Sequence, residues 1–182
     1  MKNKDKKTLI LTVSICLLPI ILGIVLYNKL PEKMPIHFTL GDEIDNYAPK
    51  NFALFGMPII TAIIQAVCLI CTTKSNKSSN NEKPKIVKIM EWFIPILTVL
   101  LYIIMIEVPL GSTVYVGKSV CLILGISFII IGNYIPKMSY ETGKSFLHPM
   151  PKSEKTFRKI NKIMEYTFII FGLILLTLII WV

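Results

Sequence analysis

Four side chains between residues 28 and 50 could take part in chemistry: His37, Asp42, Glu43 and Asp45. Histidine and carboxylates are zinc ligands and general acids or bases. A hydrolytic zinc site would need a second nitrogen or sulfur ligand nearby, and a single histidine with carboxylates at irregular spacing more commonly forms hydrogen bonds. No nucleophile and base form a recognisable pair either. The segment therefore indicates a binding surface, and we expect no catalytic residue, no metal and no cofactor.

The cysteines offer a second arrangement with chemical potential. Cys68 and Cys71 have the C-x-x-C spacing of redox and metal sites. Apolar sequence surrounds them, and no second pair of ligands follows. We therefore predict that Cys68 and Cys71 are small packing residues. All four cysteines, Cys16 and Cys121 included, fall within the apolar stretches.

The elements that must position these residues are helices that cross a membrane. The 182 residues are 53% hydrophobic and only 17% charged, whereas about a quarter of a soluble domain is charged. The apolar residues form five stretches, and a helix needs ~20 such residues to cross a bilayer. This pattern excludes a soluble enzyme, a nucleic-acid-binding domain and a secreted disulfide scaffold. It predicts an all-α integral membrane protein, a bundle of five transmembrane helices at about 9–27, 52–72, 92–106, 114–135 and 164–182.

The basic residues set the expected orientation. Of the 20 lysines and arginines, 16 lie in residues 1–8, 73–91 and 136–163, which would all face the same side. Cytoplasmic loops carry the excess of Lys and Arg. We therefore expect the N-terminus inside, the C-terminus outside and residues 28–50 in the extracellular space, with the protein in the bacterial cytoplasmic (plasma) membrane. The net charge of +9 then reflects lysine at a membrane surface, with no direct nucleic-acid partner.

The chain divides into three expected parts. Residues 1–72 form the first two helices with an extracellular cap loop at 28–50, residues 73–91 form a flexible basic cytoplasmic linker, and residues 92–182 form a three-helix unit. The third span is short and is expected to extend inward through 86–90. The first span is expected to stay uncleaved, because no A-x-A site follows it.

The cap loop is predicted to be compact. Pro31, Pro35 and Pro49 fix their backbone φ angles. Residues 34–40 alternate apolar and polar as a strand does, and a turn is expected at Gly41 and Asp42. The residues expected to form the cap or to contact a ligand are Pro35, His37, Phe38, Gly41, Asp45, Tyr47 and Lys50. Two interpretations remain open: Asp45 caps backbone amides while Tyr47 or Lys50 anchors the cap, or His37 and Asp45 contact the ligand.

A basic amphipathic helix is expected over 152–163, with Ser153 as its N-cap. Its basic residues rest on anionic membrane lipid in one interpretation and dock a cytoplasmic protein in the other. The residues expected to take part are Lys155, Phe157, Arg158, Lys159 and Lys162.

Small residues recur four positions apart in two spans. Gly117, Cys121 and Gly125 form one such face, and the first span carries another over residues 12–23. Small faces let helices approach closely. We expect packing within the bundle, with a homodimer as the alternative.

Residues 30–50 carry the pattern Leu-Pro-x3-Pro-x-His-Phe-x2-Gly-x3-Asp-x-Tyr-x2-Lys. It resembles the LPxxxPxHF…G…D.Y..K signature of a bacterial domain of unknown function that lies between the first two spans of SdpI-type immunity proteins. Residues 132–137 resemble the GNxxPK that ends a span in the SdpI domain. Residues 153–162 resemble its SEEVWRKTHR stretch, with Phe157 in place of tryptophan.

The resemblance implies an immunity protein that protects its cell by stoichiometric binding of a secreted membrane-active peptide toxin. A member of this family holds its own transcriptional repressor at the membrane, which implies an alternative: a ligand-responsive receptor that recruits a cytoplasmic regulator. A third class, a membrane enzyme acting on lipid or cell-wall precursors, has the least support from the residues.

Overall fold

The computed structural model describes residues 3–39, 41–76, 85–141, 143, 151 and 153–180. Five helical spans in this part of the chain are long and apolar enough to cross a membrane, as the sequence predicts, and they fit a multi-pass membrane protein. The helices are α1 (Asn3–Leu17), α2 (Pro19–Leu26), α3 (Met57–Asn76), α4 (Lys85–Glu107), α5 (Val116–Tyr134) and α7 (Glu154–Leu178). The first of the five spans, Asn3–Lys29, contains both α1 and α2. The strands are β1 (Lys33–Phe38) and β2 (Ile44–Pro49). Short turns of helix join them at Tyr27–Lys29, Phe52–Gly56, Val108–Leu110 and Ile135–Lys137.

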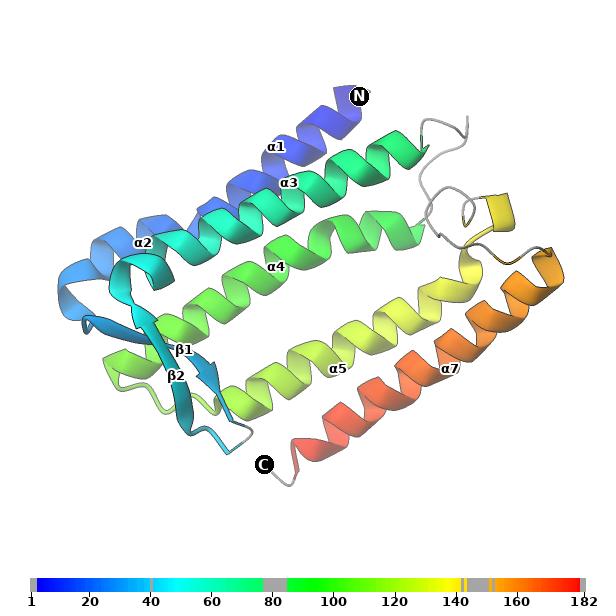
Figure 1. Cartoon of the computed structure of the whole chain (residues 1–182). Helices are drawn as coiled ribbons and strands as arrows, with labels where there is room; N and C mark the ends of the chain where they lie inside the picture. Colours follow the sequence, from blue (N-terminus) through cyan, green and yellow to red (C-terminus); the bar gives the residue numbers. More distant parts are fainter. Residues whose placement is uncertain are drawn as a thin grey trace.

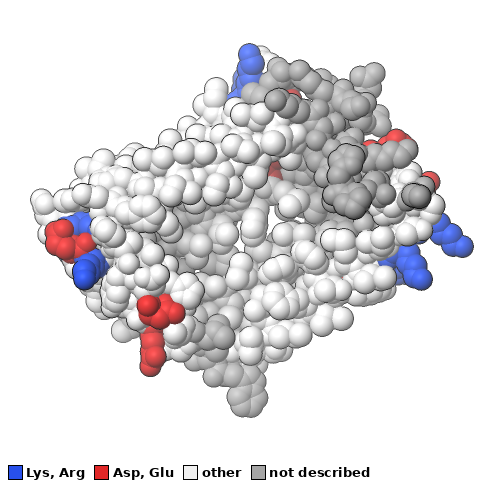
Figure 2. Space-filling view, viewed as in Figure 1, with Lys and Arg blue, Asp and Glu red and all other residues white. Residues whose placement is uncertain are grey.

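The long helices run side by side (Figure 1). The hairpin of β1 and β2 lies at the same end of the bundle as the C-terminus, and the N-terminus lies at the opposite end. Helices α1, α3 and α4 form one group, and α5 packs chiefly on α7. On the face in Figure 2, the charged side chains gather at the two ends of the helices, and the band between is almost free of them.

Several boundaries differ from the predicted ones. The third span does extend backward, because α4 begins at Lys85. Residues 73–91 are largely helical, since α3 continues to Asn76, and only residues 77–84 of this predicted linker lie outside the described residues. The predicted helix at 152–163 is not a separate element: residues 154–163 are the first turns of the continuous helix α7.

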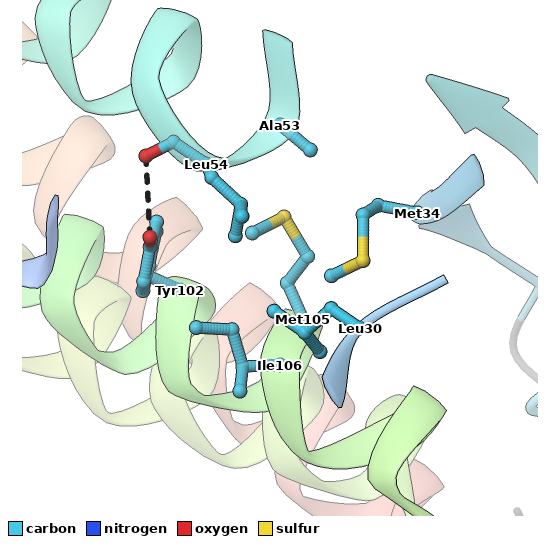
Figure 3. Packing of buried hydrophobic residues seen from close by; sticks show 7 residues of the cluster. All are labelled: Leu30, Met34, Ala53, Leu54, Tyr102, Met105 and Ile106. Carbon is cyan, nitrogen blue, oxygen red and sulfur yellow. Dashed lines mark hydrogen bonds between the residues drawn. The ribbon is translucent and has the colours of Figure 1, made fainter. Parts of the chain in front are cut away.

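The main apolar cluster joins the hairpin to the first helix group (Figure 3). Met34 of β1 is fully buried and lies against side chains from α4 and from the turn of π-helix at Phe52–Gly56. This packing fixes the hairpin on the helix ends. The cluster consists of Leu30, Met34, Ala53, Leu54, Tyr102, Met105 and Ile106.

Two prolines inside spans leave backbone carbonyls that neighbouring side chains satisfy. Pro95 has no N–H, so the Glu91 carbonyl, four residues earlier, lacks its helical donor. The side chain of Gln65, only 1% exposed on α3, donates to that carbonyl through Nε2 at 2.7 Å. An unpaired carbonyl is costly in lipid, so this bond explains why the second span contains a glutamine.

The second case lies at the hairpin end. Pro58 cannot donate to the Leu54 carbonyl four residues earlier. The hydroxyl of Tyr102, on α4, donates to that carbonyl at 3.2 Å, as the dashed line in Figure 3 shows. One tyrosine therefore ties α4 to the start of the second span.

The two faces of small residues pack against other helices of the same chain. An added Cβ at Gly172 of α7 would lie 2.7 Å from the backbone oxygen of Gly125, so α5 and α7 touch backbone to backbone there. On the first span, Thr12 and Cys16 are fully buried, and a Cβ at Gly23 would clash with the Tyr102 hydroxyl. Both faces offered by the sequence for a homodimer are thus filled within one chain.

The prediction that Cys68 and Cys71 are packing residues is wrong. Cys16 and Cys121 are buried packing residues, whereas Cys68 and Cys71 are exposed on α3. In a membrane-spanning helix an exposed apolar face meets lipid rather than water, so these two positions tolerate a small apolar side chain without packing it.

Candidate functional site

The hairpin is irregular in a way that places its polar side chains. His37 pairs with Asn46 and Phe38 pairs with Ile44, so Asp45 is an extra residue on β2. An extra residue of this kind bends a strand and redirects a side chain. A second irregularity, between Pro35 and His37, interrupts the simple alternation predicted for residues 34–40. Leu40, part of that prediction, lies outside the described residues.

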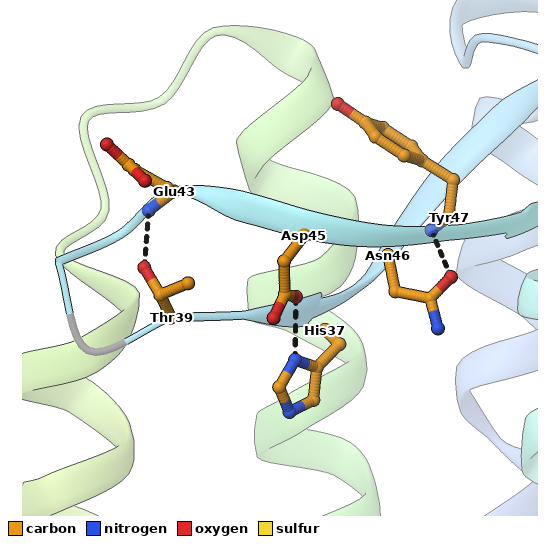
Figure 4. A network of polar contacts seen from close by, with 6 residues as sticks. All are labelled: His37, Thr39, Glu43, Asp45, Asn46 and Tyr47. Atoms are coloured by element: carbon orange, nitrogen blue, oxygen red, sulfur yellow. Dashed lines mark hydrogen bonds and ion pairs between the residues drawn. The ribbon is translucent and has the colours of Figure 1, made fainter.

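His37 and Asp45 form a pair on the hairpin surface (Figure 4). Nδ1 of His37 lies 2.6 Å from Oδ1 of Asp45, and both side chains are well exposed. Because an ionised carboxylate only accepts hydrogen bonds, Nδ1 carries the shared proton and Nε2 is left to bond a ligand. In the interpretation that made Asp45 a structural residue, its carboxylate was to cap backbone amides; in the structure it instead bonds the histidine.

Lys50 anchors the base of the hairpin, as one interpretation of the sequence proposed. Its side chain is only 6% exposed. Its Nζ donates to the carbonyls of Leu30 at 2.9 Å and Tyr27 at 3.3 Å, and lies 4.5 Å from the centre of the Tyr27 ring. Glu32, 2.9 Å away, completes the ion pair from an exposed position. Tyr47, the alternative anchor, is 51% exposed and remains accessible to a ligand.

Asp42 anchors the tip of the hairpin. Its Oδ1 accepts a hydrogen bond of 2.6 Å from the backbone N–H of Gly117, in the first turn of α5. Helix N-termini leave amide groups unsatisfied, and Tyr115 at the N-cap of α5 supplies no side-chain bond. Asp42 itself adopts a left-handed φ of 63°. The strained residue of the predicted turn is thus Asp42, not Gly41.

A cavity of about 400 Å³ lies under the hairpin, and we call it the cap cavity. Residues 35–39 of the hairpin cover it, and α3, α4 and α5 form its walls. The wall hydroxyls of Thr61, Thr98 and Tyr102 all donate to backbone carbonyls within the bundle. The walls therefore present mainly apolar surface, and His37 and Thr39 are the polar residues among those that cover the cavity.

The first turns of α7 carry the predicted basic face. Lys155, Lys159 and Lys162 are exposed. Arg158 is exposed too, but two of its nitrogens bond the Glu154 carboxylate at 3.0 and 2.6 Å. The start of α7 lies at the bundle end opposite the hairpin (Figure 1).

Phe157 does not belong to that exposed face. The predicted docking role is wrong for this residue, because its side chain is 1% exposed and packs at 5.6 Å against the ring of Tyr140. Phe157 instead holds the start of α7 against the bundle.

The side chains of the hairpin offer contacts to a ligand. The described residues contain no group of three or more His, Cys, Asp and Glu side chains that could hold a metal ion. The hairpin offers a hydrogen-bonding nitrogen on His37, a carboxylate and an exposed phenol ring above an apolar cavity. This combination suits a ligand with both polar and apolar groups.

Sequence reasoning missed the role of Asp42 and the cap cavity. The signal for Asp42 in the sequence was negative: Tyr115, at the N-cap of α5, is not a residue type that caps a helix. The cavity depends on how three separate spans diverge, and no local pattern reports that.

One segment of the chain matches a known protein family. Residues 14–62 match the family model described as "Domain of unknown function (DUF1648)". The match runs from within α1 through the hairpin into the first turns of α3, and it ends before α4. No curated protein and no solved structure matches the chain.

Proposed function

We propose that this protein is an immunity protein of the bacterial cytoplasmic membrane, which protects its cell by binding a secreted membrane-active peptide toxin one to one. The proposal draws on the resemblance to SdpI-type proteins. The DUF1648 match supports the part of that resemblance carried by residues 30–50, since it covers the whole hairpin. The orientation belongs to the proposal: the hairpin faces outside, and the N-terminus faces the cytoplasm, as the 16 basic residues on one side favour.

The observation that carries the proposal is a hairpin held at both ends over an apolar cavity. Lys50 fixes its base and Asp42 fixes its tip. A binding surface that is already ordered loses little entropy when it binds. A membrane-active peptide has apolar and polar faces. Its apolar side chains would enter the cap cavity, and its polar groups would contact His37 and Tyr47.

The test is survival of a sensitive strain that makes this protein, challenged with a panel of purified secreted membrane-active peptides. We expect a higher lethal concentration for at least one peptide. Stoichiometric binding predicts that protection rises with the amount of protein and is overcome by excess peptide, which mass spectrometry recovers intact. Continued protection with peptide breakdown would support the membrane enzyme instead. Sensitivity to every peptide, with the protein present in the membrane, would contradict the proposal.

A second candidate, the receptor that recruits a cytoplasmic regulator, is favoured by the exposed basic side chains of α7. Replacing Lys155, Arg158, Lys159 and Lys162 by glutamine should abolish signalling and leave protection intact. Unchanged signalling would contradict the receptor role. Attachment to anionic lipid would then be the proposed role of the basic face.

A further inference from the structure

A second cavity lies on the side of the bundle, outside the site described above. This lateral groove runs between α4 and α5 and has a volume of about 590 Å³. It extends from Lys88 to Leu100 on α4 and from Ile123 to Ile131 on α5. The groove exists because α5 packs chiefly on α7 and makes little contact with α4. Figure 1 shows α4 and α5 separated along their length.

The lining has the chemistry of a lipid site. Its walls are almost wholly apolar, and the one hydroxyl among them, on Ser127, donates to the Ile123 carbonyl at 2.6 Å. Lys88 is the charged residue of the lining, and Trp92 lies one turn further along α4. Lysine and tryptophan together mark the level where lipid headgroups meet the hydrocarbon.

The length of the lateral groove indicates what kind of molecule can occupy it. From Lys88 to Leu100 the groove is roughly 18 Å long at 1.5 Å per residue, close to the ~15 Å that one leaflet of a bilayer core provides. The length of the groove therefore suits an acyl chain.

We propose that the lateral groove binds an anionic phospholipid, with one acyl chain between α4 and α5 and its phosphate at Lys88. The lipid fills the space between the two helix groups that the side chains leave open. This site is separate from the proposed toxin site, although Leu97 lines both cavities.

Tryptophan fluorescence of the full chain can test for a lipid at this site. It contains two tryptophans, Trp92 and Trp181, so Trp181→Phe leaves Trp92 as the single emitter beside the groove. This variant is placed in phosphatidylcholine vesicles that contain either brominated phosphatidylglycerol or brominated phosphatidylcholine, with bromine near the headgroup end of the chain. Quenching of Trp92 measures the relative affinity for the two lipids.

We expect phosphatidylglycerol to be preferred about fivefold, the ratio that ~1 kcal/mol for one lysine near the surface gives. Lys88→Gln should remove the preference and Lys88→Arg should keep it. The matched control is Lys118→Gln, because Lys118 lies in the first turn of α5 and outside the lining of the groove. This variant should also keep the preference for phosphatidylglycerol. Ser127→Phe or Ile123→Phe should remove it by filling the groove.

Equal quenching by the two lipids in the parent chain would overturn the proposal. A preference that survives in Lys88→Gln would overturn it as well, since the headgroup would then lie elsewhere. A preference retained in both groove-filling variants would place the lipid on the outer surface of the bundle. No quenching by either lipid would mean that a second copy or another protein covers the groove. Circular dichroism and a single elution peak establish that each variant is folded.

Discussion

Lys50 is the buried charge that fixes the position of the hairpin. The two backbone carbonyls that it bonds belong to the end of the first span, so the lysine links both ends of residues 28–50. A hydrogen bond to a charged group contributes about 1.5–3 kcal/mol, while the ion pair with the exposed Glu32 adds little. The hydrogen bonds therefore dominate.

Lys50→Met tests this assignment. Methionine keeps the apolar stem and removes the ammonium, so we expect a loss of about 2 kcal/mol of stability, localised at the hairpin. Hydrogen exchange of residues 33–49 in detergent measures it. Lys33→Met, an exposed change on the same hairpin, should stay within about 0.5 kcal/mol. Equal protection in the two variants would show that Lys50 does not hold the hairpin.

Gln65 and Pro95 should be energetically coupled through the Glu91 carbonyl. In the native background, Gln65→Leu removes the donor and should cost about 1 kcal/mol, typical of a hydrogen bond between membrane helices. In a Pro95→Ala background, the alanine N–H can bond the same carbonyl, so Gln65→Leu should cost much less. The double-mutant cycle, measured by unfolding in mixed micelles, gives the coupling energy. A coupling near zero would mean that the glutamine has another role.

The roles of single residues were only partly predictable from the sequence. One of its two open interpretations made Tyr47 or Lys50 the anchor of the hairpin, and both marked Asp45 as important. The sequence could not reveal that Asp45 bonds His37, because that contact depends on a register irregularity whose position no local pattern specifies. The assignment of Phe157 to an exposed surface was wrong because the residues facing it, Tyr140 among them, come from a segment with no clear periodicity.

Among the helices, the contact between α5 and α7 depends on glycine. Alanine favours a helix by about 1 kcal/mol over glycine, yet a Cβ at Gly172 would lie 2.7 Å from the Gly125 oxygen. We expect Gly172→Ala to destabilise the pair by about 1–3 kcal/mol, since overpacking outweighs propensity.

Gly41→Ala is the matched control for this prediction. Among the described residues, a Cβ there meets the Thr39 hydroxyl at 3.9 Å and nothing nearer, so stability should change by no more than about 0.5 kcal/mol. Thermal unfolding followed by circular dichroism compares the two variants. A Gly172→Ala protein as stable as the Gly41→Ala protein would mean that α5 and α7 lie further apart.

The five spans were predictable because charge-free stretches of this length have few other uses. Which spans pack against each other was harder to predict, because small residues four positions apart indicate a close approach but do not identify the partner helix. The start of α7 at Glu154 was also hard to place, because a basic amphipathic stretch before an apolar one can lie on the membrane or continue into it.

Across the molecule as a whole, the hairpin and the start of α7 should lie on opposite sides of the membrane. In a variant with all four native cysteines replaced by alanine, we expect Glu43→Cys to react with a membrane-impermeant maleimide on intact cells. Lys159→Cys should react only after permeabilisation, because its flanking charges favour the cytoplasm. The reverse pattern would invert the topology and place the hairpin inside.

The proposed function depends on toxin binding by the exposed side of the hairpin, and survival of cells carrying His37→Ala together with Asp45→Ala is its sharpest test. These two side chains bond each other at the surface, so the double variant should keep normal membrane abundance and stability. We predict that it loses protection against a peptide that the native protein resists, while Lys33→Ala retains it. Full protection from an equally abundant double variant would contradict toxin binding at the hairpin.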